Sequence, residues 1–269
     1  MADSAGMLGA RAMIVVRALA EIPAAVLVVA EVVVLFAGVM ARYVFRAPLV
    51  WSDELASILF LWLAMLGSVI ALQRSEHMRL TTLTGRLRGA WRARVEALAA
   101  ASVAVFLLML VAPAWDYASD QWFIETPALG LHDTYRAAAI LVGAGLMLVT
   151  ALSRLLMLSW RDALAGVAVV AAVGVVLHFG APWLRLLGNW NLVLFFVLLL
   201  GAMVLLAVPI GFAFGLATLA YLANLTHTPL SIVVSRMDEG MSSLILLAVP
   251  MFVFLGLLIE MTGMARAMV

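Results

Sequence analysis

A short polar stretch, RYVFRAPLVWSDE, occupies residues 42–54 of a sequence that is 67% hydrophobic. It begins with Arg42 and Arg46 and ends with the acidic pair Asp53 and Glu54. Guanidinium groups bind carboxylates and phosphates through charge-assisted hydrogen bonds. The spacing therefore predicts that the arginines bind either the two acids or the phosphates of lipid headgroups.

The residues between these charges predict a turn at a membrane surface. Pro48 cannot continue a helix, and Ser52 is a suitable N-cap for a following helix that carries both acids in its first turn. Tyr43, Phe45 and Trp51 are of the aromatic types that gather where a membrane meets water. These local roles explain the residue types, but they do not explain the order in which they occur.

A second candidate for chemistry is Glu31, the one charged residue in the apolar run 22–40. An ionisable group inside a membrane span is costly, which makes it a functional candidate by default. Two interpretations stay open. Glu31 is either part of a proton or ion relay, or an acid that hydrogen-bonds a neighbouring helix or a partner domain.

Other kinds of chemistry have little support in the sequence. Cysteine is absent, and the four histidines lack the spacing of metal ligands. The sequence contains no phosphate-binding loop and no recognisable arrangement of nucleophile and base. We therefore predict that the chain is not an enzyme, has no metal site or organic cofactor, and does not bind nucleic acid.

Long apolar runs must position these residues. The mean hydropathy is +1.17 and only 12% of residues are charged, which excludes an ordinary soluble domain. Runs of about 20 apolar residues predict transmembrane helices. Besides residues 22–40, the apolar runs are 55–72, 97–115, 137–153 and 163–184. The predicted fold class is all-α, a polytopic helical membrane protein in the lipid bilayer.

The charges of the loops predict the orientation of these helices. Residues 73–94 hold six arginines and one acid, whereas residues 113–136 hold four acids and one arginine. Basic residues concentrate in cytoplasmic loops near membrane spans. We therefore predict that the first loop is cytoplasmic and that the second is external.

The remaining arginines complete this topology. Arg11 and Arg17 precede the first apolar run, and Arg154 and Arg161 follow the fourth. The prediction is a bundle of four spans with a cytoplasmic N-terminus, so that the opening polar stretch lies outside. Residues 7–17 are either a short interfacial helix or a frayed start.

The polar stretch and the span after it also resemble a known family. Residues 41–80, ARYVFRAPLVWSDELASILFLWLAMLGSVIALQRSEHMRL, are similar to the small membrane subunit of the tripartite ATP-independent periplasmic (TRAP) transporters. The matching positions are Arg42, Tyr43, Phe45, Trp51, Asp53, Glu54, Trp62, Leu66, Gly67, Arg74 and His77. The resemblance implies a scaffold that braces the transport domain and helps to dock a binding protein. The candidate bracing and docking residues are Arg42, Arg46, Trp51, Asp53, Glu54, Arg74 and His77.

The second half of the chain resembles the start of the large TRAP membrane subunit. The similar segments are residues 198–222 and 237–265, with matches at Pro209, Gly211, Gly215, Gly240, Ser242, Leu247, Ala248, Pro250, Phe252 and Gly256. Fusing the two subunits requires one extra crossing, which residues 163–184 supply. The predicted domains are a small-subunit part at 1–160, a connecting transmembrane helix at 161–190, and the N-terminal part of the large subunit at 191–269.

Proline and glycine interrupt the apolar segments of this second half. Short segments broken in this way are typical of the discontinuous helices of secondary transporters. The candidates are Pro209, Gly211, Pro250 and Gly256. A kinked but ordinary span is the alternative, because neighbouring helices can satisfy the freed backbone groups. Residues 228–239 are predicted to form an amphipathic connector at the membrane surface.

The resemblance implies a membrane component of a secondary transporter in the bacterial inner membrane. It would take up an organic acid, such as a C4-dicarboxylate or sialic acid, that a periplasmic binding protein delivers, with sodium as the coupling ion. The rest of the large subunit would be a further partner, and we expect the substrate and sodium sites mostly beyond Val269. Residues 1–269 alone are then expected not to transport. The alternative is a non-transporting membrane scaffold or assembly subunit.

Overall fold

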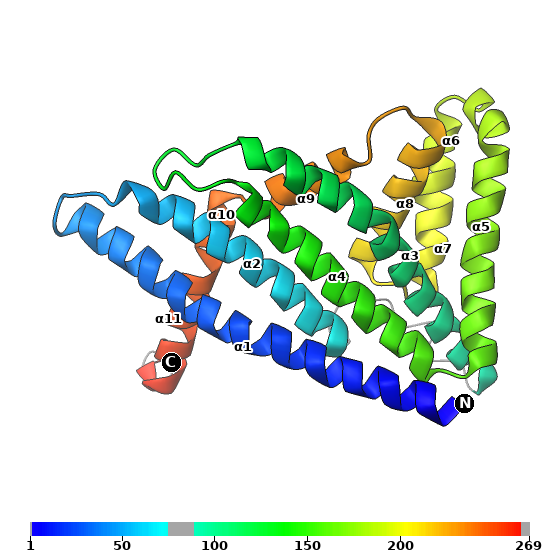
Figure 1. The fold of residues 1–269 in the computed structure, drawn as a ribbon, viewed down its shortest axis with the longest axis horizontal. Coiled ribbons are helices and arrows are strands. Elements are labelled where there is room, and N and C mark those ends of the chain that lie inside the picture. The colour runs from blue at the N-terminus through cyan, green and yellow to red at the C-terminus, as the bar shows by residue number, and fades with distance from the viewer. Residues whose placement is uncertain (1, 75–88, 265–269) are drawn as a thin grey trace.

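The computed structural model of the chain describes residues 2–74 and 89–264 (Figure 1). Almost all of these residues are helical. Within the described ranges, extended pairing is limited to an isolated bridge between Glu125 and His132. The prediction of an all-α polytopic membrane protein is confirmed.

Four helices lie side by side and alternate in direction. They are α1 (Ala2–Tyr43), α2 (Val50–Arg74), α3 (Ala90–Asp120) and α4 (Thr134–Met157). One end of this bundle holds the turn at residues 44–49 and the segment 121–133, and we call it the hairpin end (Figure 1). The other end holds Arg17, Arg74, Arg94 and Arg154, and we call it the arginine end. The four helices make up the four-helix portion.

The first helix is longer than the sequence predicts. α1 is one continuous helix of 42 residues, so residues 7–17 form neither a separate interfacial helix nor a frayed start. Arginine has a good helix propensity, and Arg17 is four residues before Glu21 on the same helical face, with 3.0 Å between their side chains. A helix of this length extends about 63 Å, roughly twice the hydrocarbon thickness of a bilayer. α1 therefore has to tilt or extend beyond the membrane.

Small residues allow the helices of this portion to approach closely. Ala101 and Ala104 of α3 and Ala139 and Ala144 of α4 are buried in the core. At Gly143 of α4, an added Cβ would lie 2.6 Å from the side chain of Met65 in α2. Lipid is as apolar as the helix surfaces, so the hydrophobic effect does not drive membrane helices together. Close packing of small residues contributes to their association instead.

The next helix, α5 (Trp160–Leu186), stands against α3 and is inclined to the other helices of the four-helix portion (Figure 1). Ser159 caps its N-terminus by accepting a hydrogen bond from the backbone N–H of Asp162. An added Cβ on Gly166 would lie 2.8 Å from the backbone carbonyl of Ala97, so α5 and α3 touch backbone to backbone. Only 6% of the apolar window of α5 is buried, which leaves the remainder for lipid or other protein.

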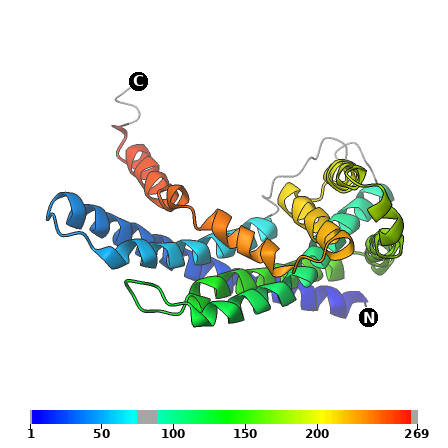
Figure 2. The same ribbon diagram turned by 90° about the horizontal axis from the view of Figure 1, so that it is seen from above.

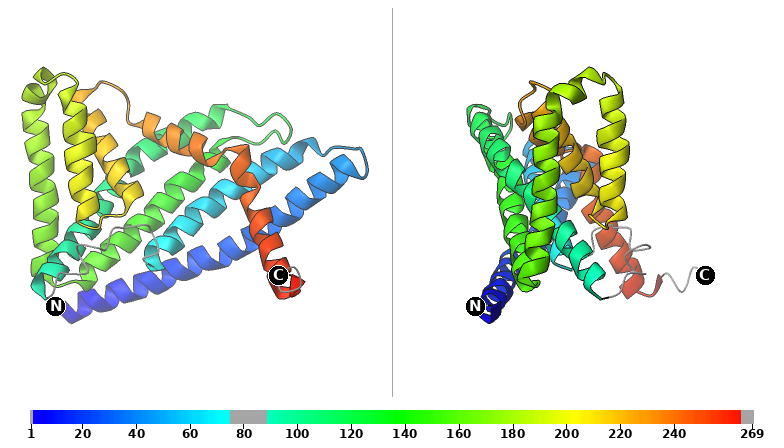
Figure 3. Two further views of the ribbon diagram at one scale, coloured as in Figure 1. Left: turned by 180° about the vertical axis from the view of Figure 1, so that it is seen from behind. Right: turned by 90° about the vertical axis from the view of Figure 1, so that its right-hand side faces the viewer.

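Two short helices follow and form an antiparallel hairpin. The first comprises α6 (Trp190–Val193), a π-helical segment labelled η3 (Leu194–Leu199) and α7 (Leu200–Leu205). The second is α8 (Ile210–Leu225), whose 16 residues extend about 24 Å, less than a full bilayer crossing. The chain reverses between them, at Ala207 with a φ of 60° and at Pro209 (Figure 3). A kinked but continuous span is therefore the wrong interpretation here.

The last helices lie across the four-helix portion. α9 (Ser231–Met241) packs on α3, α4 and α2, and α10 (Leu244–Leu247) contacts α2 (Figure 2). α11 (Val249–Met261) then passes beside α1. The direction changes by 54° between α9 and the following helical segment Ile245–Met261. α9 occupies the segment predicted as an amphipathic connector.

Five helices within the described residues are long and apolar enough to cross a membrane, namely those of α1 to α5. Two shorter apolar helices, 190–205 and 210–225, do not reach that length. The extra crossing predicted at residues 163–184 corresponds to α5.

Candidate functional site

The two acids of the opening polar stretch have different partners at the hairpin end. Arg42 donates to Asp53 across the α1–α2 turn, with 3.2 Å between the nitrogen and the oxygen, and both side chains are more than half exposed. Glu54 instead accepts from the backbone N–H groups of Ala128 at 2.9 Å and Leu129 at 3.0 Å. The Glu54 carboxylate thus fastens the α3–α4 connection to the start of α2.

Two details of this stretch differ from the sequence-based interpretation. α2 begins at Val50, so Ser52 is not the N-cap, and its Oγ donates to the Leu49 carbonyl at 2.7 Å. The helix starts early because Leu49, after Pro48, already supplies the first accepting carbonyl, which bonds the Ser52 N–H at 3.1 Å. Arg46 belongs to no ion pair of the described residues, although pairing with the acids was one of its predicted roles. Its φ of 55° places it at the reversal of the turn.

The remaining candidates from the same motif do not join this cluster. Arg74 binds Glu21 at 2.9 Å at the arginine end, the opposite end of the bundle. Arg154, also at that end, caps α2 by donating to the carbonyls of Leu72 and Gln73. Trp51 lies at the hairpin end and is 38% exposed, and His77 is outside the described residues. The seven candidates therefore do not form one site.

Glu31 lies inside the four-helix portion. Its side chain is 0% exposed, and neither carboxylate oxygen has a hydrogen-bond partner among the described residues. The interpretation of Glu31 as an acid hydrogen-bonded to a neighbouring helix therefore finds no support in the described contacts.

The four broken-helix candidates are placed in two ways. Pro209 precedes α8 at the chain reversal, and Pro250 is buried in the first turn of α11. An added Cβ on Gly211 or Gly256 would meet nothing within 4 Å. The two prolines mark helix starts, whereas the two glycines are not needed for close packing against any described residue.

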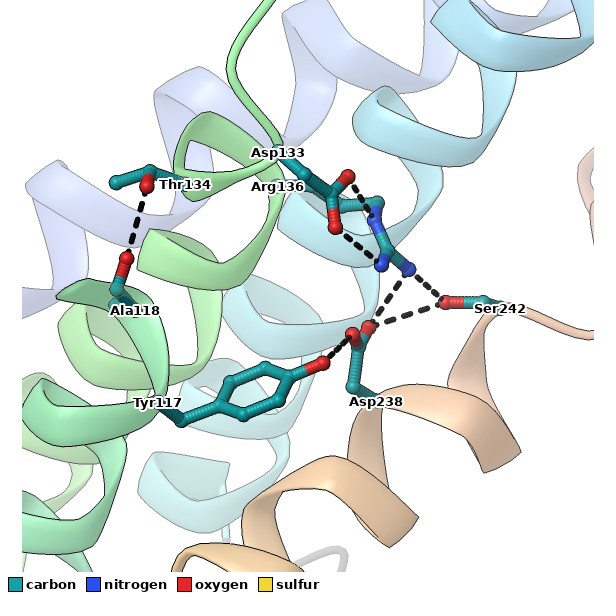
Figure 4. A network of polar contacts seen from close by, with 7 residues as sticks. All are labelled: Tyr117, Ala118, Asp133, Thr134, Arg136, Asp238 and Ser242. Atoms are coloured by element: carbon teal, nitrogen blue, oxygen red, sulfur yellow. Dashed lines mark hydrogen bonds and ion pairs between the residues drawn. The ribbon is translucent and has the colours of Figure 1, made fainter. Parts of the chain in front are cut away.

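A buried polar network near the hairpin end connects the four-helix portion to α9 (Figure 4). At its centre, Arg136 of α4 forms a bidentate pair with Asp133, with bonds of 2.8 and 2.7 Å. The same guanidinium donates through Nη1 to Asp238 of α9 at 2.9 Å and to Ser242 at 2.5 Å. Tyr117 of α3 donates its hydroxyl hydrogen to Asp238 at 2.6 Å. We call these five residues the Arg136 network.

The charged side chains of the Arg136 network are largely buried, so the loss of one of them should lower stability. The side chains of Arg136, Asp133 and Asp238 are 18%, 12% and 3% exposed. Ser242 also donates to Asp238 at 3.1 Å, so the Asp238 carboxylate has three partners. Removing one partner of a buried ion pair typically costs about 3–5 kcal/mol, because the other charge stays buried and uncompensated. The network therefore fixes where α9 lies on the bundle.

An open hollow of about 660 Å³ adjoins the network. Its lining includes Tyr117, Arg136, Asp238 and Ser242, together with Ile232, Ser235, Arg236 and Glu239 of α9. Arg236 and Glu239 pair with each other at 2.6 Å on the exposed face of α9. Among the described residues, no group of three or more histidines and acids is arranged to hold a metal ion.

Sequence reasoning did not find this network. The sequence identifies Arg136 and Asp133 only as loop charges, and Asp238 only as part of the amphipathic connector. One signal was available, because Arg136 is the single base in the otherwise acidic segment 113–136. Its partner on α9, 102 residues further along the chain, had no such signal.

Comparisons with known proteins divide the chain into two matched regions, with Arg136 in the first and Asp238 in the second. Residues 31–161 match the model of the DctQ component of the tripartite ATP-independent periplasmic transporters, and residues 192–269 match that of the DctM component. The chain belongs to the TRAP transporter family. It joins a small permease component to a part of a large permease component, and both are components of transporters rather than enzymes.

Curated relatives agree with this assignment. The sialic acid TRAP transporter permease protein SiaT of Haemophilus influenzae is 24% identical over 245 residues, which is 87% of this chain. The chain spans 40% of the length of that relative. The sialic acid TRAP transporter small permease protein SiaQ of Vibrio cholerae is 25% identical over 143 residues, 52% of this chain and 82% of that protein.

The residues of the Arg136 network come from both matched regions. Tyr117, Asp133 and Arg136 lie in the small-component region, and Asp238 and Ser242 lie in the large-component region. The network therefore connects the two permease components through side-chain contacts.

Proposed function

We propose that this chain is part of the membrane component of a secondary transporter, and that its four-helix portion holds the large-component region in a fixed position. The observation that carries the proposal is the Arg136 network, which connects the two TRAP components through a nearly buried ion pair. The connecting helix α5 adds a further contact to the large-component region, in which Arg185 donates to the backbone carbonyl of Asn224 in α8 at 3.0 Å.

The transported substrate in this proposal is an organic acid, with sialic acid as the first choice to test. Two relatives are named as sialic acid permeases, which supports that choice over other carboxylates. Sodium as the coupling ion, and delivery by a periplasmic binding protein, follow from the family resemblance alone. The bacterial inner membrane with a cytoplasmic N-terminus is the proposed location, and the gathering of basic side chains at the arginine end supports that orientation.

The hairpin end is the proposed docking face for the binding protein. Its exposed charges include Arg42, Arg46 and Asp53, and its exposed aromatic residues include Tyr43, Phe45 and Trp51. Reversing both acids, as Asp53→Arg with Glu54→Arg, should lower uptake while membrane insertion persists. Unchanged uptake by this double variant would show that the stretch serves only its local structural contacts and not docking.

The test of transport uses proteoliposomes that contain the complete transporter to which this chain belongs. Labelled sialic acid and a C4-dicarboxylate are offered with the matching binding protein under an inward sodium gradient. Accumulation that needs both the binding protein and the gradient supports the proposal. Accumulation without sodium would overturn the coupling, and no accumulation by a correctly assembled complex would favour the alternative of a membrane scaffold.

A further inference from the structure

We propose that Glu31 is a proton-binding site inside the four-helix portion, a carboxyl group that is held as the neutral acid and takes a proton rather than a metal cation. The side chain is 0% exposed, and both of its oxygens lack a hydrogen-bond partner among the described residues. None of the ion pairs formed by those residues includes it. This inference is independent of the proposed transport activity.

Glu31 lies on a strip of α1 that is otherwise apolar. Ala24 and Ala41 are buried on the same helix, and Leu27 packs against the core. These positions follow the spacing of three and four residues that keeps side chains on one face of a helix. The charges of α1 that pair with α2, at Glu21 and Arg42, are ten or eleven positions away, about 15 Å along the axis.

The charged residues of the neighbouring helices have other partners or positions. α1 packs on α2, α4 and α11. The charged residues of these helices are Asp53, Glu54 and Arg74 of α2, Arg136 and Arg154 of α4, and Glu260 of α11. Asp53 binds Arg42, Glu54 binds the backbone N–H of Ala128, and Arg74 binds Glu21. Arg136 belongs to the Arg136 network, and Arg154 donates to the carbonyls of Leu72 and Gln73. Glu260 is exposed. No described cation is therefore placed to balance an ionised Glu31.

An unbalanced carboxylate at this position is energetically unfavourable. Burying an isolated ionised group is far more costly than burying a neutral polar group, and proteins avoid the cost by neutralising it. A bound proton removes the charge and needs only one carboxylate oxygen. A sodium ion needs several oxygens around it, and the two oxygens of Glu31 are the only buried side-chain oxygens of the described residues without a hydrogen bond. The local chemistry therefore favours a proton.

The same isolation limits what the proton can do. A relay passes a proton between neighbouring titratable groups, and among the described residues no other orphaned side-chain oxygen is available to accept it. Glu31 is thus an end point for a proton and not a step in a chain of transfers. The described contacts therefore support neither a relay nor a hydrogen bond to a neighbouring helix, and they favour a third role, a site that holds its proton.

Infrared spectroscopy of the full chain in lipid nanodiscs tests this inference. The difference spectrum between the parent and Glu31→Gln, recorded at pH 6, should show the loss of a protonated carboxyl C=O band. The band should not change when sodium chloride is replaced by choline chloride. Glu21→Gln is the matched control on the same helix, because Glu21 binds Arg17 and Arg74 and should contribute ionised carboxylate bands instead. Loss of carboxylate bands in Glu31→Gln, or a sodium-dependent band, would overturn the proposal.

Thermal unfolding gives a second, independent readout. Gln keeps the size and neutrality of the protonated acid, so Glu31→Gln should unfold at a temperature no lower than the parent. Glu31→Leu removes an unsatisfied polar group and should unfold at a higher temperature. If both neutral variants unfold at lower temperatures, Glu31 is ionised and balanced by a cation, which contradicts the proposal.

Discussion

Breaking the Arg136–Asp238 pair should release α9 from the four-helix portion. Arg136→Met leaves Asp133 and Asp238 buried near each other without a cation, because Arg136 is the one base that bonds both. We expect this variant to lose about 5 kcal/mol, the upper part of the range for a broken buried pair. Asp238→Asn leaves Arg136 with its bidentate bonds to Asp133, so the expected loss is smaller, about 3 kcal/mol.

The assay is hydrogen exchange of the α9 backbone amides in detergent or nanodiscs. Losses of this size should speed exchange in residues 231–241 by more than about a hundredfold, since about 1.4 kcal/mol corresponds to a factor of ten. Glu239→Gln is the matched control on the same helix. Its pair with Arg236 is exposed on both sides, at 73% and 67%, and should contribute at most about 1 kcal/mol.

Two results would refute this reasoning. The first is an Asp238→Asn variant whose α9 amides exchange no faster than those of Glu239→Gln. The second is an Arg136→Met variant less perturbed than Asp238→Asn, because the structure assigns the larger electrostatic cost to loss of the arginine. A double variant carrying both changes completes the cycle and measures the coupling between the two residues.

Three further predictions concern other contacts. Glu54→Gln should speed amide exchange at Ala128 at least about tenfold, because the ionised acceptor of that N–H is lost; exchange at the parent rate would contradict the contact. In intact cells, an impermeant thiol reagent should label Ala128→Cys but not Arg92→Cys, on a chain with no cysteine of its own; the reverse pattern would invert the proposed topology. Gly166→Leu should lower the thermal unfolding temperature by separating α5 from α3, whereas Gly174→Leu on the same helix, with nothing within 4 Å, should not; equal effects would show that the Gly166 contact is unimportant.

The helices α2 to α5 could be predicted because the membrane imposes a simple rule on their composition. The uncharged runs at 55–72, 97–115, 137–153 and 163–184 all lie inside observed helices. The rule detects the apolar core of a helix but not its ends. This is why α1 extends back through Arg11 and Arg17, whose charges mark the end of an apolar run without ending a helix.

The hairpin of residues 190–225 shows a second limit of sequence reasoning. Pro209 predicts an interruption, since proline cannot continue a helix. Whether the chain then bends or reverses depends on what the next helix packs against. Here α8 contacts α3 and α5, and the ring centroids of Phe212 in α8 and Phe106 in α3 are 5.8 Å apart. This packing favours the reversal of the chain. The contact becomes visible only once the helices are placed in three dimensions.

The Arg136 network was beyond prediction for a related reason, and its role follows from how the two components are joined. Arg136 and Asp238 are far apart in sequence, and each side chain alone is consistent with a solvated loop or helix. In this chain α5 already connects the two TRAP components covalently, so the network does not need to supply the affinity that holds them together. Its buried, directional bonds serve instead to fix the orientation of α9. Loss of Asp238 should therefore appear as local opening of α9, with the remaining helices still assembled.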